Sequence, residues 1–202
     1  MTEYIKKLID DYIISTRGKL YAPIPHPYFS GIESVHDNRS DVIINCVKND
    51  ISSLKTGIDI GSHWGHMCYE LENCGIEMTA VESYKGAYDV LTFLKEDSGR
   101  DFKTIHGDIF SFSEINYDII LALNIFHHFI KTEKKFNNLK ELLSRINCKI
   151  MFFQSHNTKE TQMVGSYKNF NNDEFVDFIL ENSNLSKSEC ILQGRRPIYK
   201  IT

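Results

Sequence analysis

A loop with two glycines directly follows the apolar residues 56–60, which are typical of a buried strand. Glycine lets the backbone turn tightly and come close to a ligand at the start of a following helix. The sequence therefore predicts that this loop binds a ligand of the nucleoside type. Its candidate ligand-binding residues are Asp59, Gly61, Ser62, His63 and Gly65.

The position of His63 narrows the kind of ligand. A dinucleotide-binding loop has a middle glycine that lets pyrophosphate approach the backbone, and His63 occupies that position here. Its bulky side chain disfavours NAD. S-adenosylmethionine has no phosphate and tolerates a side chain at this point, and the Asp59 carboxylate can hold its ammonium group directly or through water.

Acidic residues follow the next two predicted strands. Glu82, followed by Ser83, comes roughly 20 residues after the loop, where a carboxylate can accept hydrogen bonds from both ribose hydroxyls. Asp108 can accept one from the adenine amino group, and Ile109 can cover the adenine ring. These residues predict the ribose and adenine ends of a nucleoside site.

A fourth strand ends at Leu123 and Asn124, at the edge where ligands of open α/β sheets bind. The histidines that follow, His127 and His128, are the candidate catalytic residues. If the acceptor is a hydroxyl, either imidazole can take its proton. Equally, one imidazole can be a hydrogen-bonded wall of the site.

A phosphate or carboxylate acceptor needs no base. In that case Arg195, Arg196 or Lys168 is expected to bind the acceptor by charge pairing. At the end of the fifth strand Gln154 or His156 can face the acceptor, and Gln154 is taken as a further candidate substrate residue. His63 and His66 have helical spacing, but no third ligand is evident, so we predict no metal site.

Apolar runs alternate with helical patterns from residue 55 onward, which is typical of a parallel sheet with helices on both faces. The turn between the last two strands is too short for a parallel crossover, so they are expected to form an antiparallel hairpin. We therefore predict a Rossmann-like α/β fold with a mostly parallel seven-stranded sheet and an antiparallel last strand. The expected strands are 56–60, 77–82, 102–106, 117–123, 148–154, 187–193 and 196–201, and the expected helices 64–74, 84–96, 131–146 and 172–182.

An N-terminal arm is expected before this core. Helical spacing of apolar residues predicts helices over 3–16 and from about Asn38 to Asn49. Between them, residues 21–28 contain three of the four prolines, which predicts an extended, ordered segment.

Composition indicates a single domain over residues 1–202, with the arm in 1–50 and the core in 55–202. The chain is 42% hydrophobic, enough for one substantial core. Its formal net charge of −4, from 23 Lys and Arg against 27 Asp and Glu, disfavours a nucleic-acid partner. The five cysteines form no CxxC pair, and no apolar run resembles a signal peptide or a membrane span. These features favour a cytoplasmic protein with reduced thiols; its oligomeric state is left open.

The sequence resembles the class I S-adenosylmethionine-dependent methyltransferases over roughly residues 55–154. The shared features are the glycine loop, the acidic strand ends and the histidines after the fourth strand. A narrower resemblance, over nearly the whole chain, is to the methyltransferase domain of the bacterial O-antigen chain-terminating kinase/methyltransferases. Its points of contact are Tyr21, His26-Pro27, Phe29, Gly31, Asn38-Arg39, Asp41-Val42-Ile43, the Asp59 loop, 125–128 and 196–199.

This resemblance implies that Tyr21 and Arg39 close over the cofactor, with Arg39 paired to the methionine carboxylate. The implied cofactor is S-adenosyl-L-methionine, with S-adenosyl-L-homocysteine as its product. The implied reaction is O-methylation of a small-molecule, sugar or glycan-phosphate acceptor. An RNA or protein methyltransferase, or an inactive cofactor-binding partner subunit, remain alternatives.

Overall fold

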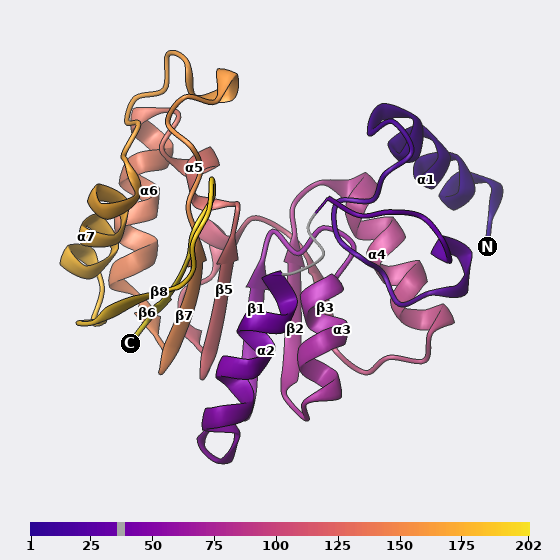
Figure 1. The fold of residues 1–202 in the computed structure, drawn as a ribbon, viewed down its shortest axis with the longest axis horizontal. Coiled ribbons are helices and arrows are strands. Elements are labelled where there is room, and N and C mark those ends of the chain that lie inside the picture. The colour runs from indigo at the N-terminus through magenta and orange to yellow at the C-terminus, as the bar shows by residue number, and fades with distance from the viewer. Residues whose placement is uncertain (36–38) are drawn as a thin grey trace. The chain divides into compact units, whose positions relative to one another are not determined.

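A seven-stranded sheet organises the computed structural model, which describes residues 1–35 and 39–202 (Figure 1). Its strands are β1 (Thr56–Ile60), β2 (Glu77–Glu82), β3 (Lys103–His106), β5 (Ile119–Leu123), β7 (Ile150–Gln154), β8 (Ser188–Leu192) and β9 (Ile198–Ile201). The strand order is β3-β2-β1-β5-β7-β9-β8. β2 pairs with β3, β1 with β5 and β5 with β7 in parallel, whereas β9 is antiparallel to both β7 and β8. The predicted fold class and the final hairpin are therefore confirmed.

The helices follow the predicted pattern with shifts of a few residues at their ends. They are α1 (Glu3–Ser15), α2 (Arg39–Asp50), α3 (His66–Asn73), α4 (Lys85–Asp97), α5 (Phe126–Phe129), α6 (Glu133–Ser144) and α7 (Asn172–Asn182). The expected start of the second helix, Asn38, lies outside the described residues. α3 begins two residues later than predicted because Gly65, at its N-cap, has a φ of 81°. The short α5 was not predicted.

Two very short strands were also not predicted. β4 (Ile115–Asn116) and β6 (Ile146–Asn147) pair in parallel as a separate sheet. A strand of two residues shows no alternation of apolar and polar positions, so its sequence carries no periodic signal.

The first of two compact units contains residues 1–55 and 61–108. In it α3 and α4 pack on β2, α1 packs on α4, and α2 packs on α3. Ile9, Ile43, Tyr69 and Leu91 are fully buried there. This packing fixes the arm helices onto the elements that carry the glycine loop.

The second compact unit contains residues 56–60 and 109–202. Every residue of β5 and β7 is buried, as expected for central strands of an α/β sheet. Thr56 N donates to Asp118 Oδ2 at 3.1 Å, and Asp118 N donates to Thr56 Oγ1 at 3.2 Å, which aligns the starts of β1 and β5. The expectation of one domain over 1–202 stays a prediction.

The proline-rich segment of the arm is anchored to the first unit. Leu20 and Ser34 form a parallel bridge, and the ring of His26 makes a 2.9 Å hydrogen bond with Asp97 of α4. The expectation of a fully extended segment was wrong at its end, because Pro27–Phe29 form a 3-10 turn. Proline suits that first position, since the turn requires no donor from its nitrogen.

All five cysteines have free thiols. Within 1–35 and 39–202, no helix has the length and apolar character needed to cross a bilayer. Over the same ranges, no group of three or more His, Cys, Asp or Glu side chains is arranged to hold a metal ion.

A capping box at the start of α7 gives a test of the fold. Asn171 Oδ1 accepts a hydrogen bond from Glu174 N, and the Glu174 side chain accepts one from Asn171 N. We expect Asn171→Ala to lower the free energy of unfolding by about 1 kcal/mol, measured by urea denaturation. Asn137→Ala, on the exposed face of α6, is the control and should change it by less than about 0.5 kcal/mol. Equal effects of the two substitutions would contradict the cap.

Candidate functional site

The glycine loop turns sharply at the end of β1. The N–H groups of Gly61 and Ser62 both donate to the carbonyl of Val81, at 2.9 and 3.1 Å, so the loop is tied to β2. Gly61, His63 and Gly65 all have positive φ, at 72°, 51° and 81°. A positive φ is easy for glycine and unfavourable for residues with a side chain. Gly61 and Gly65 therefore suit this backbone conformation, whereas His63 adopts it at a cost in free energy.

Gly65 is also required by packing. A Cβ at this position would lie 2.5 Å from Cδ1 of the fully buried Leu91. The lack of a side chain at Gly65 thus lets the loop pack on α4, and the expected contact of Gly65 with a ligand stays a prediction.

Glu82 ends β2 with its side chain 8% exposed. Its Oε2 accepts a hydrogen bond from His63 N at 2.9 Å, and its Oε1 accepts one from Tyr84 N at 2.7 Å. Each carboxylate oxygen has a second lone pair, so Glu82 can hold the loop and still accept hydrogen bonds from ligand hydroxyls.

Ser83 and Asp108 lie near Glu82 at the carboxyl ends of β2 and β3. Glu82 is opposite His106 in the strand register, and Gly107 N donates to the Glu82 carbonyl at 3.1 Å. The His106 ring is 3.3 Å from the Ser83 carbonyl. Ser83 and Asp108 are both exposed. The structure thus brings the predicted ribose and adenine residues of the first unit together.

Tyr21 and Arg39 from the arm meet the loop at His63. The Arg39 guanidinium lies 4.9 Å above the centre of the Tyr21 ring, and its Nη1 donates to the Tyr21 hydroxyl at 3.4 Å. The Tyr21 ring centre is 5.7 Å from that of His63, which stacks on Trp64 at 5.0 Å. Arg39 is only 5% exposed. A buried cation is therefore held against the Tyr21 ring, which in turn contacts the loop.

Two buried polar side chains at this loop need a partner. Ser62 Oγ and the ring nitrogens of His66 make no hydrogen bond with the described residues. Burial lowers the pKa of His66 to about 4, helped by the charge of Arg39 and opposed by the Pro23 carbonyl, which falls short of hydrogen-bond geometry. Since unpaired buried polar groups are costly, these atoms indicate a place for a polar ligand or water.

In the second unit Asn124 and Gln154 form a buried link between the ends of β5 and β7. Asn124 Nδ2 donates to Gln154 Oε1 at 2.8 Å, and Gln154 Nε2 donates to the Arg196 carbonyl at 3.1 Å. Asn124 has a positive φ of 56°. Gln154, expected to contact substrate, thus has a structural role. Its substrate contact stays a prediction.

Arg196 is bound by a carboxylate of its own chain. Its Nε and Nη2 donate to the two oxygens of Glu160 at 2.8 and 2.6 Å. Burial acts to raise the pKa of Glu160, but the hydrogen bonds from Arg196 and Gln162 outweigh it and lower that pKa to about 2. Arg195 is exposed. Of the two candidate arginines, Arg196 therefore has its charge already paired.

Three imidazoles lie together in the second unit. The ring centre of His127 is 4.0 Å from that of His128 and 5.8 Å from that of His156. Burial lowers the pKa of His127 to about 3, with His128 and Arg196 adding to the shift. Partial burial and the charge of Lys131 lower the pKa of His128, although exposure to water weakens this shift. His127 is therefore neutral at pH 7.

The remaining candidate residues of the second unit, Asp59, Ile109 and Leu123, are all buried. His156 was predicted only as an alternative to Gln154 at the acceptor, and Glu160 was not predicted to belong to the site. The only sequence signal for His156 is its position just after a predicted strand. No sequence signal indicates that Glu160 pairs with Arg196.

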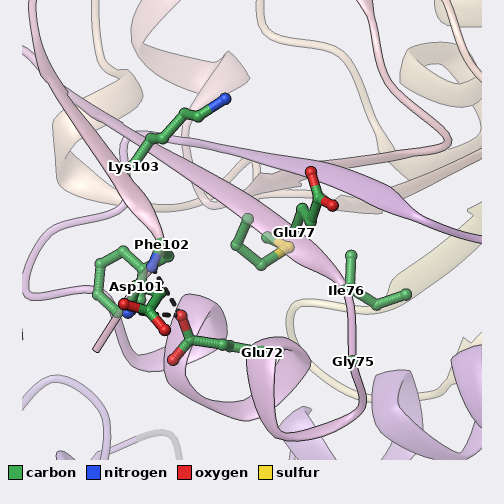
Figure 2. Close-up of a pocket in the computed structure, with 8 residues that line it drawn as sticks. Glu72, Gly75, Ile76, Glu77, Asp101, Phe102 and Lys103 are labelled. Carbon is green, nitrogen blue, oxygen red and sulfur yellow. Dashed lines mark hydrogen bonds between the residues drawn. The ribbon is translucent and has the colours of Figure 1, made fainter. Parts of the chain in front are cut away.

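A separate hollow of about 380 Å³ lies at the amino ends of β2 and β3 (Figure 2). There the Glu72 carboxylate accepts hydrogen bonds from the N–H groups of Asp101 and Phe102, at 2.9 and 2.6 Å. Glu77 begins β2 here, at the other end of the strand from Glu82. None of the predicted site residues lines this hollow.

Comparison with known proteins gives matches in structure. No protein-family model and no curated protein sequence matches the chain. A structure of monomeric WbdD is 18% identical with a TM-score of 0.73, and the match covers 95% of this chain and 48% of WbdD. Another structure, described as the bifunctional kinase-methyltransferase WbdD, is 18% identical with a TM-score of 0.69. That match covers 95% of this chain and 45% of WbdD. This chain thus spans about half the length of WbdD.

Two smaller proteins match over nearly their whole length. Magnesium protoporphyrin IX methyltransferase (ChlM) from Synechocystis PCC 6803, solved with bound S-adenosylmethionine, is 11% identical with a TM-score of 0.63, covering 98% of this chain and 96% of ChlM. An S-adenosylmethionine-dependent methyltransferase from Clostridium acetobutylicum ATCC 824 is 11% identical with a TM-score of 0.66, covering 98% of each. The chain therefore has the fold of these methyltransferases, which confirms the predicted resemblance at the level of the fold.

Proposed function

We propose that this protein is an S-adenosylmethionine-dependent methyltransferase that methylates an oxygen of a small-molecule, sugar or glycan-phosphate acceptor. The fold shared with several methyltransferases supports the reaction class. The observation that carries the proposal is Glu82, whose buried carboxylate ends β2 and orients the glycine loop through His63 N. A carboxylate at this place suits the two hydroxyls of a ribose.

The residues of the first unit fit a nucleoside with an amino-acid end. The carboxylate of Glu82 would accept from the ribose hydroxyls, and Asp108 from the adenine amino group. Ser62 Oγ, buried without a partner among the described residues, would gain one from the ligand. When bound, S-adenosylmethionine supplies a methyl group on a positively charged sulfur.

Arg39 and Tyr21 would hold the carboxylate end of the cofactor. Arg39 is buried against the Tyr21 ring, so its charge is less screened by water than that of a surface arginine. Its planar guanidinium can pair with a carboxylate in two hydrogen bonds. The arm would then act as a lid that helps exclude water.

Residues of the second unit would handle the acceptor. Neutral His127 can take a proton from a hydroxyl, and His128 lies beside it. Asn124 and Gln154 would fix the ends of β5 and β7 that carry these groups. Since alignment and exclusion of water supply much of the catalysis of a displacement, a rigid frame is itself a contribution.

The ribose assignment is tested by calorimetry with S-adenosylhomocysteine. We expect Glu82→Gln to weaken binding by roughly tenfold and Glu82→Ala by up to about a hundredfold, because hydrogen bonds to a charged group are lost. Glu77→Gln is the matched control, since it makes the same change at the exposed other end of β2 and should leave the affinity unchanged.

Urea denaturation of each variant separates ligand contact from loop stability, because Glu82 also accepts from His63 N. No binding of S-adenosylmethionine or S-adenosylhomocysteine by the folded wild type would overturn the proposal. Binding without methyl transfer to sugars, sugar phosphates or cell extract would favour a cofactor-binding partner subunit.

The lid role of the arm predicts that Arg39→Ala lowers the affinity for S-adenosylhomocysteine by roughly tenfold. Arg39→Lys should have an intermediate effect, because it keeps the charge but loses the planar pair of donors. Both affinities are measured by the same calorimetry at low and high salt. An Arg39→Ala protein that is folded and binds with wild-type affinity would show that the arm does not contact the cofactor.

A further inference from the structure

His156, predicted only as an alternative to Gln154 at the acceptor, lies two residues after the end of β7 with only 1% of its surface exposed. Its Nε2 is 2.9 Å from Oδ1 of Asn169. A buried imidazole in this place is held by specific contacts. Its ring also packs against Phe175 with centres 5.9 Å apart.

Asn169 determines which nitrogen of His156 carries the proton. The amide nitrogen of Asn169 donates to the Thr158 carbonyl at 3.0 Å, so its Oδ1 is the atom that faces His156. Because that oxygen can only accept, Nε2 of His156 must be the protonated nitrogen. The lone pair of a neutral His156 is therefore on Nδ1.

Nδ1 of His156 is buried and makes no hydrogen bond with the described residues. Burial and the nearby charges of Arg196 and Lys131 keep this imidazole neutral by lowering its pKa, against the opposing effects of Asn169 and Glu160. A buried acceptor without a donor is unfavourable, so a donor is expected in the working state. His127, whose ring centre is 5.8 Å away, has one ring N–H in its neutral form and is the nearest candidate donor among the imidazoles.

We propose that His156 is a positioning residue that accepts a hydrogen bond on Nδ1 from a ring N–H of His127. The ring centres are slightly too far apart for a direct hydrogen bond between the two imidazoles, so the hydrogen bond forms by a rotation of the His127 side chain. His127 is then held as the tautomer whose other nitrogen has the lone pair. This makes His127, rather than His128, the base of the acceptor site.

The proposal rests on the proposed function and narrows the acceptor to a group that carries a proton, such as a hydroxyl. The O–H proton moves to the lone pair of His127, and the electron pair left on oxygen forms the bond to the transferred methyl. The electron pair of the broken carbon–sulfur bond stays on the sulfur of the donor. A fully ionised phosphate has no proton that His127 could take.

The decisive measurement is nuclear magnetic resonance of the full chain with ¹⁵N-labelled histidine, in the presence of S-adenosylhomocysteine at pH 7. We expect His156 to be protonated on Nε2 alone and His127 to have a single tautomer. Asn169→Ala should give His156 a mixture of tautomers, and Asn169→Asp should restore protonation on Nε2. A wild-type His156 protonated on Nδ1 would overturn the proposal.

The link to His127 is tested by a second pair of variants. His156→Phe removes the acceptor and should give His127 a mixture of tautomers, whereas His156→Asn places an oxygen near the position of Nδ1 and should restore one form. Asn137→Ala, on the exposed face of α6, is the control that should change neither ring. A His127 signal unchanged in a folded His156→Phe protein would contradict the link.

Calorimetry on the same samples keeps the two claims apart. If the wild type does not bind S-adenosylhomocysteine, the proposed function is wrong, but the tautomers of His156 and His127 still test the positioning role. Normal binding with the wrong tautomers would remove only the positioning role.

Discussion

The carboxylate of Glu82 is the interaction on which the glycine loop depends. One oxygen accepts from His63 N and the other from Tyr84 N, so a single side chain fixes the loop after β1 and the start of α4. The left-handed backbone at His63 is unfavourable for a residue with a side chain and needs such support. A ligand bound to Glu82 would therefore meet a loop that is already in place.

A comparable network of hydrogen bonds organises the second unit. Asn124 is joined to Gln154, and Gln154 to the carbonyl of Arg196, whose guanidinium is held by Glu160. These contacts connect the ends of β5 and β7 to the chain just before β9. The charge of Arg196 is therefore already paired within this network.

Much of the fold could be predicted because its signals are local. Apolar strands of four to six residues separated by helical patterns gave β1, β2 and β7 at or close to their observed bounds. The short β4 and β6 could not be found, since two residues carry no periodicity. The residue type at Gly65 was noticed, but its packing against Leu91 depends on the distance between two helices in space.

The residues of the candidate site also fall into those that a local sequence signal indicates and those that only the folded chain brings together. The places of Glu82 and Asp108 at the ends of strands could be predicted because an acid after an apolar run is visible in the sequence, and their contacts with a ligand stay predictions. The pairing of His156 with Asn169 was missed because the two residues are 13 positions apart and neither residue type signals a pair until the chain folds. Glu160 and Arg196 are 36 positions apart and give no sequence signal either.

Trp64, the only tryptophan in the sequence, gives the most direct test of the cofactor loop. It is buried in the loop and stacks on His63 and on Phe29. Its fluorescence should change in a saturable way, with one site per chain, when S-adenosylhomocysteine is added, and NAD should have no effect. A change with NAD and none with S-adenosylhomocysteine would contradict the assignment of this loop to a methyl donor.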